Sequence, residues 1–242
     1  MKKTLMTILV SGLMLASCSK QEVSDNPLLQ KWDTPFETAP FEKIKVEHYL
    51  PAFEAAIAEH NKEIQAIIDN AEAPTFDNTI AALDYSGETL SKVAGVFFNM
   101  MAANTSEELQ KVNEQVGPMM ATHSDNVSMN AKLFEKIKAV YDAKDSQKYT
   151  GEQLALLEKT YNKFVRSGAL LDAAKQEELR KVNAELTKVE SKFDANLLKE
   201  SKAYQLVIDK EENLKGLPQG EIEKAAALAK QEGKEGKWIF TL

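Results

Sequence analysis

Between residues 46 and 201 the apolar residues recur every three or four positions, segment after segment. This spacing places them on one face of an α-helix, whereas a half-buried strand would need strict alternation. The longest stripe follows Asp172 and consists of Leu179, Val182, Leu186, Val189, Phe193 and Leu197. The sequence therefore predicts a mainly α fold, a multi-helix domain over residues 46–201, whose longest helix runs from Asp172 as N-cap to about Ser201.

Such a long stripe is also compatible with a coiled-coil dimer. We expect it to pack within the chain instead, because the neighbouring helices also have apolar faces that need to be covered.

Five shorter helices are expected before the long one. The first runs from about Glu47 to Asp69, and the second from Thr75 as N-cap to about Met101. The third is opened by a capping box at Thr105–Glu108. The fourth lies around 133–141, and the fifth runs from Thr150 to a glycine stop at Gly168. Within the third segment, Gly117 followed by Pro118 should kink or break the helix.

The periodicity changes after Ser201. Tyr204–Ile208 is typical of a strand, residues around Glu221–Gln231 of a short helix, and Lys237–Leu242 of a second strand. Residues 202–242 are thus predicted to start a mixed α/β segment with a small β element near the C-terminus. The last residues are apolar with no turn or tail after them, and two strands alone are marginally stable, so we expect this segment to be truncated.

The other end has the pattern of a bacterial lipoprotein leader. Met1–Lys3 is basic, Leu5–Ala16 is apolar but too short for a stable span, and Leu15-Ala16-Ser17-Cys18 has the form of a lipobox. We expect residues 1–17 to be a signal peptide and Cys18 to be acylated, which anchors the protein to a membrane of the cell envelope. The alternative is an ordinary signal peptide with a chance cysteine.

Residues 18–45 are predicted to be a lipidated tether and an extended segment. Pro27, Pro35 and Pro40 each remove a backbone donor and disfavour helix in the residue before them. Apolar residues in its later part suggest that this part packs on the helical body.

Composition excludes two classes of protein. The chain is 43% hydrophobic and 28% charged, which is typical of a folded domain rather than a disordered one. Its formal net charge is −7, and it becomes more negative if Lys2 and Lys3 leave with the leader. Nucleic-acid binding needs clustered cations, so a nucleic-acid partner is not expected.

The histidines do not form a recognisable metal motif. A hydrolytic zinc site needs three protein ligands and an open position for water. None of His48, His60 and His123 belongs to an HExxH motif, and the first two are not one helical turn apart. The segment Glu59–Glu63 is interpreted as a solvated helix face, and His123 as a helix-surface or satisfied core residue. The sequence therefore assigns no metal ligand and expects no zinc on this chain.

Nucleophilic catalysis has no candidate either. G-x-S-x-G, P-loop and G-x-G-x-x-G patterns are absent, and the lone cysteine belongs to the lipobox. The carboxylates alternate with lysines on helix faces, which is typical of surface charge. Met100-Met101 and Met119-Met120 could line an adaptable groove, but core packing is the favoured interpretation. No catalytic residue is assigned.

Several motifs, in order along the chain, resemble a known family. They are Asn26-Pro27-Leu28-Leu29, Pro35-Phe36 with Pro40-Phe41, Ile44–Phe53, Pro74–Ile80, Val96–Asn99, Phe164–Gly168 and Gly236–Leu242. Together they are similar to the N-terminal region of the thimet-oligopeptidase-like zinc metallopeptidases, in particular the peptidyl-dipeptidase (dipeptidyl carboxypeptidase) branch.

The resemblance implies a mostly helical enzyme whose N-terminal helices wall a deep channel for short oligopeptides. Zinc would be the cofactor of the parent enzyme, held by an HExxH motif and a later glutamate far beyond the matched region. The first functional hypothesis is therefore the substrate-channel portion of a peptidase that removes C-terminal dipeptides, inactive by itself. The alternative is a non-catalytic helical envelope lipoprotein that acts as a peptide-binding or interaction module.

Overall fold

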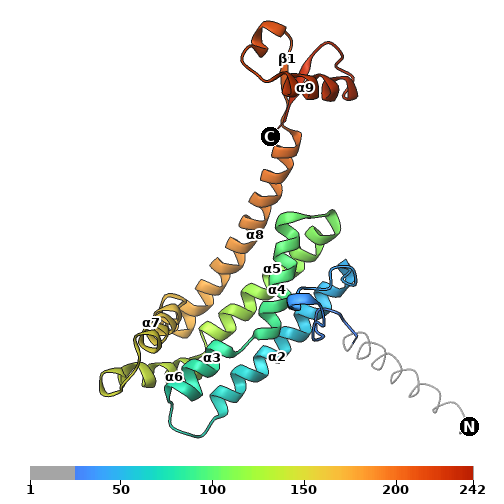
Figure 1. The fold of residues 1–242 in the computed structure, drawn as a ribbon. Coiled ribbons are helices and arrows are strands. Elements are labelled where there is room, and N and C mark those ends of the chain that lie inside the picture. Colours follow the sequence, from blue (N-terminus) through green and yellow to red (C-terminus); the bar gives the residue numbers. More distant parts are fainter. Residues whose placement is uncertain (1–24, 242) are drawn as a thin grey trace, which may run out of the picture. The chain divides into compact units, whose positions relative to one another are not determined.

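The computed structural model describes residues 25–241, so the predicted leader and Cys18 lie outside the described residues. The described chain is mainly helical with one two-stranded sheet, as the sequence predicts (Figure 1). It divides into two compact units, the first ending at Thr187 and the second beginning at Lys188. None of the helices within residues 25–241 combines the length and hydrophobicity that crossing a bilayer requires.

The first unit contains most of the helices. In chain order they are η1 (Pro35–Glu37), η2 (Val46–His48), α2 (Tyr49–Asp69), the π-helical η3 (Phe76–Ala81), α3 (Ala82–Tyr85), α4 (Glu88–Ala103), α5 (Glu107–Ser128), α6 (Ala131–Asp142), η4 (Lys144–Ser146), α7 (Gly151–Arg166) and the first part of α8 (Ala173–Ala203). Helix α2 contacts α4, α5 and α6, so it is the central element of this unit; Figure 1 labels these helices.

Local capping chemistry fixes the start of several helices. The hydroxyl of Thr75 accepts from the N–H of Asn78 at 3.2 Å, while the Asn78 side chain accepts from the N–H of Thr75 at 2.8 Å. Thr150 and Gln153 form the same reciprocal pair at the start of α7. Both N-caps are as predicted. The third predicted helix begins one position later than its motif suggested, with Ser106 as the N-cap.

The second predicted helix is not continuous, which corrects the sequence-based expectation. It is divided at Ser86, which is extended, and Gly87, whose φ is +75° in the left-handed region. The hydroxyl of Ser86 donates to the carbonyl of Leu83 at 2.7 Å, and the N–H of Gly87 donates to Oε2 of Glu63 at 2.7 Å. These bonds satisfy the backbone at the break, so the chain can turn there.

The sequence predicts a kink or a break at Gly117-Pro118, and the prediction of a break is wrong. Helix α5 continues through both residues, and Val116 just before them is fully buried. Packing against the core thus outweighs the local cost of a proline inside the helix.

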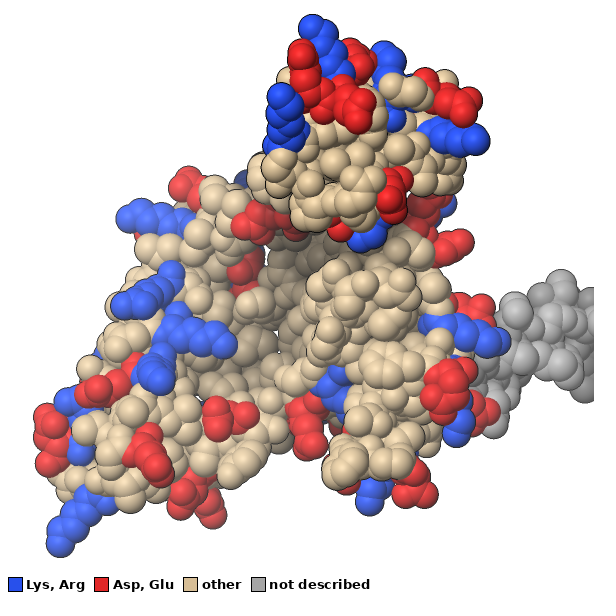
Figure 2. Space-filling view, turned by 45° about the horizontal axis from the view of Figure 1, so that its top comes forward, with Lys and Arg blue, Asp and Glu red and all other residues tan. Residues whose placement is uncertain are grey.

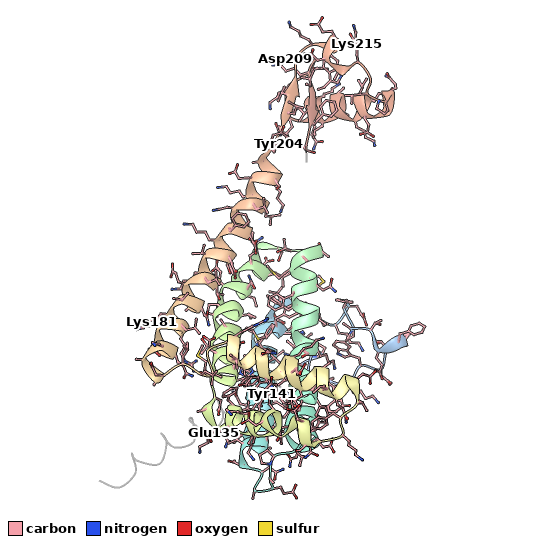
Figure 3. All side chains as sticks on the ribbon, turned by 90° about the vertical axis from the view of Figure 1, so that its left-hand side faces the viewer. Glu135, Tyr141, Lys181, Tyr204, Asp209 and Lys215 are labelled. Carbon is pink, nitrogen blue, oxygen red and sulfur yellow. The ribbon has the colours of Figure 1, made fainter. Side chains whose placement is uncertain are left out.

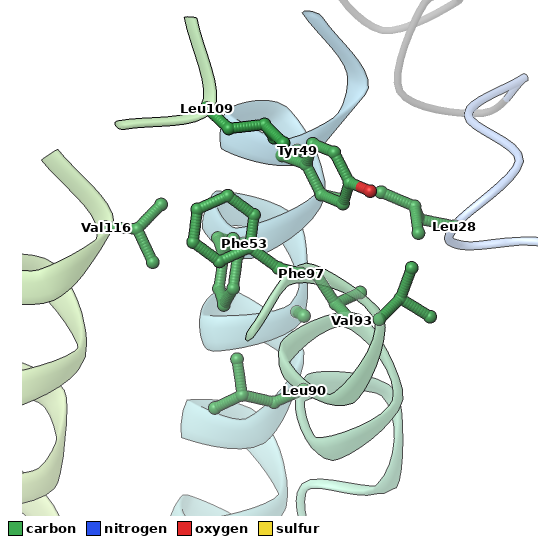
Figure 4. Packing of buried hydrophobic residues seen from close by; sticks show 11 residues of the cluster. Leu28, Tyr49, Phe53, Leu90, Val93, Phe97, Leu109 and Val116 are labelled. Atoms are coloured by element: carbon green, nitrogen blue, oxygen red, sulfur yellow. The ribbon is translucent and has the colours of Figure 1, made fainter. Parts of the chain in front are cut away.

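Two hydrophobic clusters form the core of the first unit. In the first, Phe53 of α2 meets Phe97 of α4 edge to face, with ring centroids 5.4 Å apart (Figure 4). Leu28 is fully buried in this cluster, so the later part of the tether packs on the body as expected. The second cluster joins η3, α6 and α7 to the end of α2 and includes Ile80, Leu133, Ile137 and Leu157.

Helix α8 differs from the expectation of intrachain packing. No residue of α8 is buried in the described chain, and in the first unit the stripe residues Val182 and Leu186 are 61% and 51% exposed. Side chains stand off the helix, among them Lys181 (Figure 3). Its contacts with α5 are polar: Arg180 donates to Asn126 at 3.0 Å and Asn183 to Asp125 at 2.8 Å. Arg180 and Asn183 lie on a different face from Val182 and Leu186, so within the first unit α5 does not cover these two apolar residues.

The second unit has the strand–helix–strand order that the sequence predicts. It contains β1 (Leu206–Ile208), η5 (Glu211–Leu214), α9 (Gln219–Gln231) and β2 (Trp238–Phe240). The strands are antiparallel, with Leu206 opposite Phe240 and Ile208 opposite Trp238. Helix α9 lies against β2, and Ile239 and Ala229 are buried between them.

Candidate functional site

Two of the three histidines meet between α2 and α5. Nδ1 of His60 lies 2.8 Å from Nε2 of His123, and the two rings meet edge to face with centroids 4.9 Å apart. His123 is 6% exposed and His60 is half-buried. The interpretation of Glu59–Glu63 as a solvated face is therefore wrong for His60, while His123 is the satisfied core residue that was one of its two expected roles.

A third residue completes the group. Nε2 of His60 lies 3.1 Å from the hydroxyl oxygen of Ser86, at the turn between α3 and α4. The adjacent Gly87 lies over the His60 ring, where an added Cβ would come within 3.1 Å of Cε1. We call His60, Ser86 and His123 the histidine clasp, because they join α2, α5 and the α3–α4 turn.

The hydrogen bonds of the clasp determine where its protons lie. A carbonyl oxygen only accepts, so the Ser86 hydroxyl must give its single proton to Leu83. Its oxygen can then only accept from His60, which places the His60 proton on Nε2. Nδ1 of His60 consequently accepts from His123, which carries its proton on Nε2. For a neutral pair, this order of donors is the one that makes all three bonds at once.

Burial keeps the clasp neutral near pH 7. Desolvation lowers the pKa of both imidazoles below the ordinary value of 6.5. The charge of Glu63 raises the pKa of His60, and that of Lys163 lowers it. A charge on His60 lowers the pKa of His123 further.

Beside the clasp, α2 and α5 form an open hollow of about 350 Å³. It is lined by Ile57, Asn61, Pro118, Met119, Thr122, His123 and Asn126, and we call it the α2–α5 hollow. The four methionines singled out in the sequence are partly buried against the first core cluster, so the core-packing interpretation is confirmed. Met119 additionally contributes to this hollow.

These residues do not fit a catalytic zinc ion. Two nitrogens bound tetrahedrally to one zinc at ~2.0–2.1 Å lie about 3.3 Å apart, and both present lone pairs to the metal. His60 and His123 are 2.8 Å apart with one donating to the other. His48 is engaged elsewhere, accepting from the N–H of Lys45 at 3.0 Å. Within residues 25–241, no group of three or more His, Cys, Asp or Glu side chains could hold a metal ion.

Sequence reasoning missed the clasp because its histidines are 63 residues apart and share no motif.

The visible surface shows no dominant basic area: acidic and basic side chains are interspersed among uncharged ones (Figure 2). Cys18, the predicted lipidation site, lies outside the described residues.

Comparisons with known proteins place this helical unit in a family. The family model described as "Neurolysin/Thimet oligopeptidase, N-terminal domain" matches residues 53–176. The chain is 36% identical to a dipeptidyl carboxypeptidase of Salmonella typhimurium, over 91% of this chain and 32% of the relative. It is also 36% identical to the Escherichia coli dipeptidyl carboxypeptidase, over 90% of this chain and 32% of the relative.

A probable cytosolic oligopeptidase A of Arabidopsis thaliana is 26% identical over 93% of this chain and 32% of the relative. The chain thus spans about a third of the length of these curated relatives. The matched residues include the helices that form both core clusters and carry the clasp. The chain belongs to the thimet-oligopeptidase-like family and represents its N-terminal domain.

Proposed function

We propose that this chain is the N-terminal, substrate-channel part of a zinc metallo-oligopeptidase that removes C-terminal dipeptides from short peptides. The observation that carries the proposal is the 36% identity to dipeptidyl carboxypeptidases over about nine-tenths of the chain. Identity to oligopeptidase A relatives is lower, at 26%. This difference favours the dipeptidyl carboxypeptidase branch over the oligopeptidase A branch.

In this proposal the chain supplies a scaffold rather than the chemistry. Its two core clusters tie α2 to α4, α5, α6 and α7, which gives a rigid helical wall. A rigid wall that narrows a channel would select short, unstructured peptides by excluding folded ones. The zinc ligands and the general base would belong to the part of the relatives that this chain does not match.

We also propose that the protein is anchored in the bacterial cell envelope through acylated Cys18. The support is the sequence Leu15-Ala16-Ser17-Cys18 at the end of a short apolar stretch. Acyl chains at the N-terminus would leave the helical units on the aqueous side of the membrane.

A chimera tests the channel proposal. The matched third of the Escherichia coli dipeptidyl carboxypeptidase is replaced with residues 25–241 of this chain, and dipeptide release from a short peptide is measured. We expect chelator-sensitive release by the chimera and none by the relative's remaining two-thirds alone. A parallel chimera carrying Phe97→Ala, which opens the first core cluster, should lose activity together with its folded structure.

The alternative function, a non-catalytic peptide-binding lipoprotein, gives the opposite result. A folded but inactive chimera, together with peptide binding by the 242-residue chain alone, would contradict the proposed role and support that module.

A further inference from the structure

We propose that the histidine clasp is an acid-sensitive latch: it holds α5 against α2 while the pair carries at most one added proton, and it opens when both imidazoles are protonated. This inference is independent of the proposed peptidase role, because it rests only on contacts within the first unit.

The geometry sets how many protons the latch tolerates. His123 donates through Nε2, so a proton added to its Nδ1 would leave that bond intact. A proton added to Nδ1 of His60 is accommodated only if His123 carries its own proton on Nδ1 and accepts through Nε2. When both imidazoles are protonated, two N–H groups face each other across 2.8 Å. Either the pair remains singly protonated or the α2–α5 contact separates.

Neighbouring charges act on protonation of the pair in both directions. From α2, the carboxylate of Glu63 accepts from the N–H of Gly87 at 2.7 Å, and its negative charge favours protonation of His60. From α7, Lys163 adds a positive charge that opposes protonation of His60. The α3–α4 turn offers Ser86 and Gly87, which do not titrate.

On α5 itself, Asp125 lies two positions from His123, and its carboxylate accepts from Asn183 of α8. Arg180 of α8 is held by Asn126, so it brings a further positive charge toward this end of α5. Desolvation, the largest influence on the pKa of both imidazoles, favours the neutral pair.

The direction of the pH effect follows from the lowered pKa values. Both histidines titrate below 6.5 in the folded protein and near 6.5 when unfolded. Above pH 6.5 neither state is protonated, and the clasp contributes its full stabilisation. As the pH falls below 6.5, the unfolded chain binds protons that the folded chain excludes, so stability is lost until the folded pKa values are passed. Each unit of pKa depression corresponds to about a tenfold loss in the folding equilibrium constant.

Opening of the clasp would change the size of the α2–α5 hollow. His123 is both a clasp member and a lining residue, and Asn61 lies one position after His60. Separation of α5 from α2 would therefore widen this hollow and expose its lining to water.

The test measures urea unfolding of the 242-residue chain between pH 7.5 and 5.0, beside two variants. His123→Gln retains a side-chain N–H that can reach His60 but cannot take up a proton. His48→Gln is the matched control, because His48 lies outside the clasp. We expect the unaltered chain and His48→Gln to lose more of their folding equilibrium constant on acidification than His123→Gln does, because that variant removes one of the two groups whose pKa is lowered by folding.

A second measurement does not depend on any variant folding. Nitrogen chemical shifts of labelled histidine should show Nε2–H tautomers for both His60 and His123 at pH 7.5. Amide exchange in α5, corrected for its intrinsic pH dependence, should accelerate as the pair protonates. An unchanged acid sensitivity in folded His123→Gln, or independent titration of the two rings near 6.5, would overturn the latch.

Discussion

The backbone N–H of Gly87 donates to Oε2 of Glu63 across 2.7 Å, and this bond ties the α3–α4 turn to α2 directly beside His60. Gly87 is buried, has a φ of +75°, and lies over the His60 ring. The residue therefore meets two requirements at once: a left-handed backbone and the absence of a Cβ.

We expect Gly87→Ala to lower the free energy of unfolding by about 1–3 kcal/mol, because the new methyl group is strained by the positive φ and crowds His60. Gly95→Ala is the matched control: Gly95 is helical, and an added Cβ would meet nothing within 4 Å. That change should stabilise the protein by about 0.5–1 kcal/mol. Equal effects at the two glycines in urea unfolding would contradict this account.

Two adjacent phenylalanines should differ in their contribution to stability. Phe97 is fully buried between Tyr49 and Phe53, whereas Phe98 is 43% exposed. We expect Phe97→Ala to cost about 3–5 kcal/mol, because it leaves a cavity in the first core cluster. Phe98→Ala should cost clearly less. Thermal or urea unfolding of both variants at neutral pH makes the comparison.

The exposed stripe of α8 predicts an effect on association rather than on folding. Phe193 is 63% exposed, so Phe193→Ser should change the free energy of unfolding by less than about 1 kcal/mol. It should reduce self-association at high protein concentration, because exposed apolar surface favours nonspecific contact. Light scattering and unfolding of the same sample separate the two effects, and a large loss of stability would show that the stripe is covered in solution.

The side chains that could serve as metal ligands predict how the chain binds zinc. We expect the 242-residue chain alone to bind less than one equivalent of zinc in equilibrium dialysis and to release no dipeptides from a short peptide, since its described residues offer no three-ligand cluster. Stoichiometric, tight zinc with chelator-sensitive peptide cleavage would refute this expectation.

The lipobox predicts membrane association through one residue. In cells expressing the full chain, Cys18→Ala should move the protein from the membrane fraction to the soluble fraction, because it removes the acylated side chain. Ser19→Ala is a nearby control that leaves the cysteine in place. If Cys18→Ala remained as membrane-bound as the unaltered protein, the lipid-anchor proposal would fail.

The sequence by itself determined the features that depend on neighbours along the chain. Helical periodicity, the N-caps Thr75 and Thr150, and the strand–helix–strand order after residue 201 each arise within a few residues, so they could be read directly. The family resemblance is also carried by ordered local motifs, and the comparisons confirm it.

Tertiary structure decided the rest, because these features depend on residues that are distant in sequence. The histidine clasp joins positions 60, 86 and 123, and no local pattern encodes their approach. The break at Gly87 is stabilised by Glu63 from another helix, while packing around Val116 keeps α5 unbroken at Pro118. Local propensity favours breaks at glycine and proline, but burial and hydrogen bonding between helices determine which of these breaks occur.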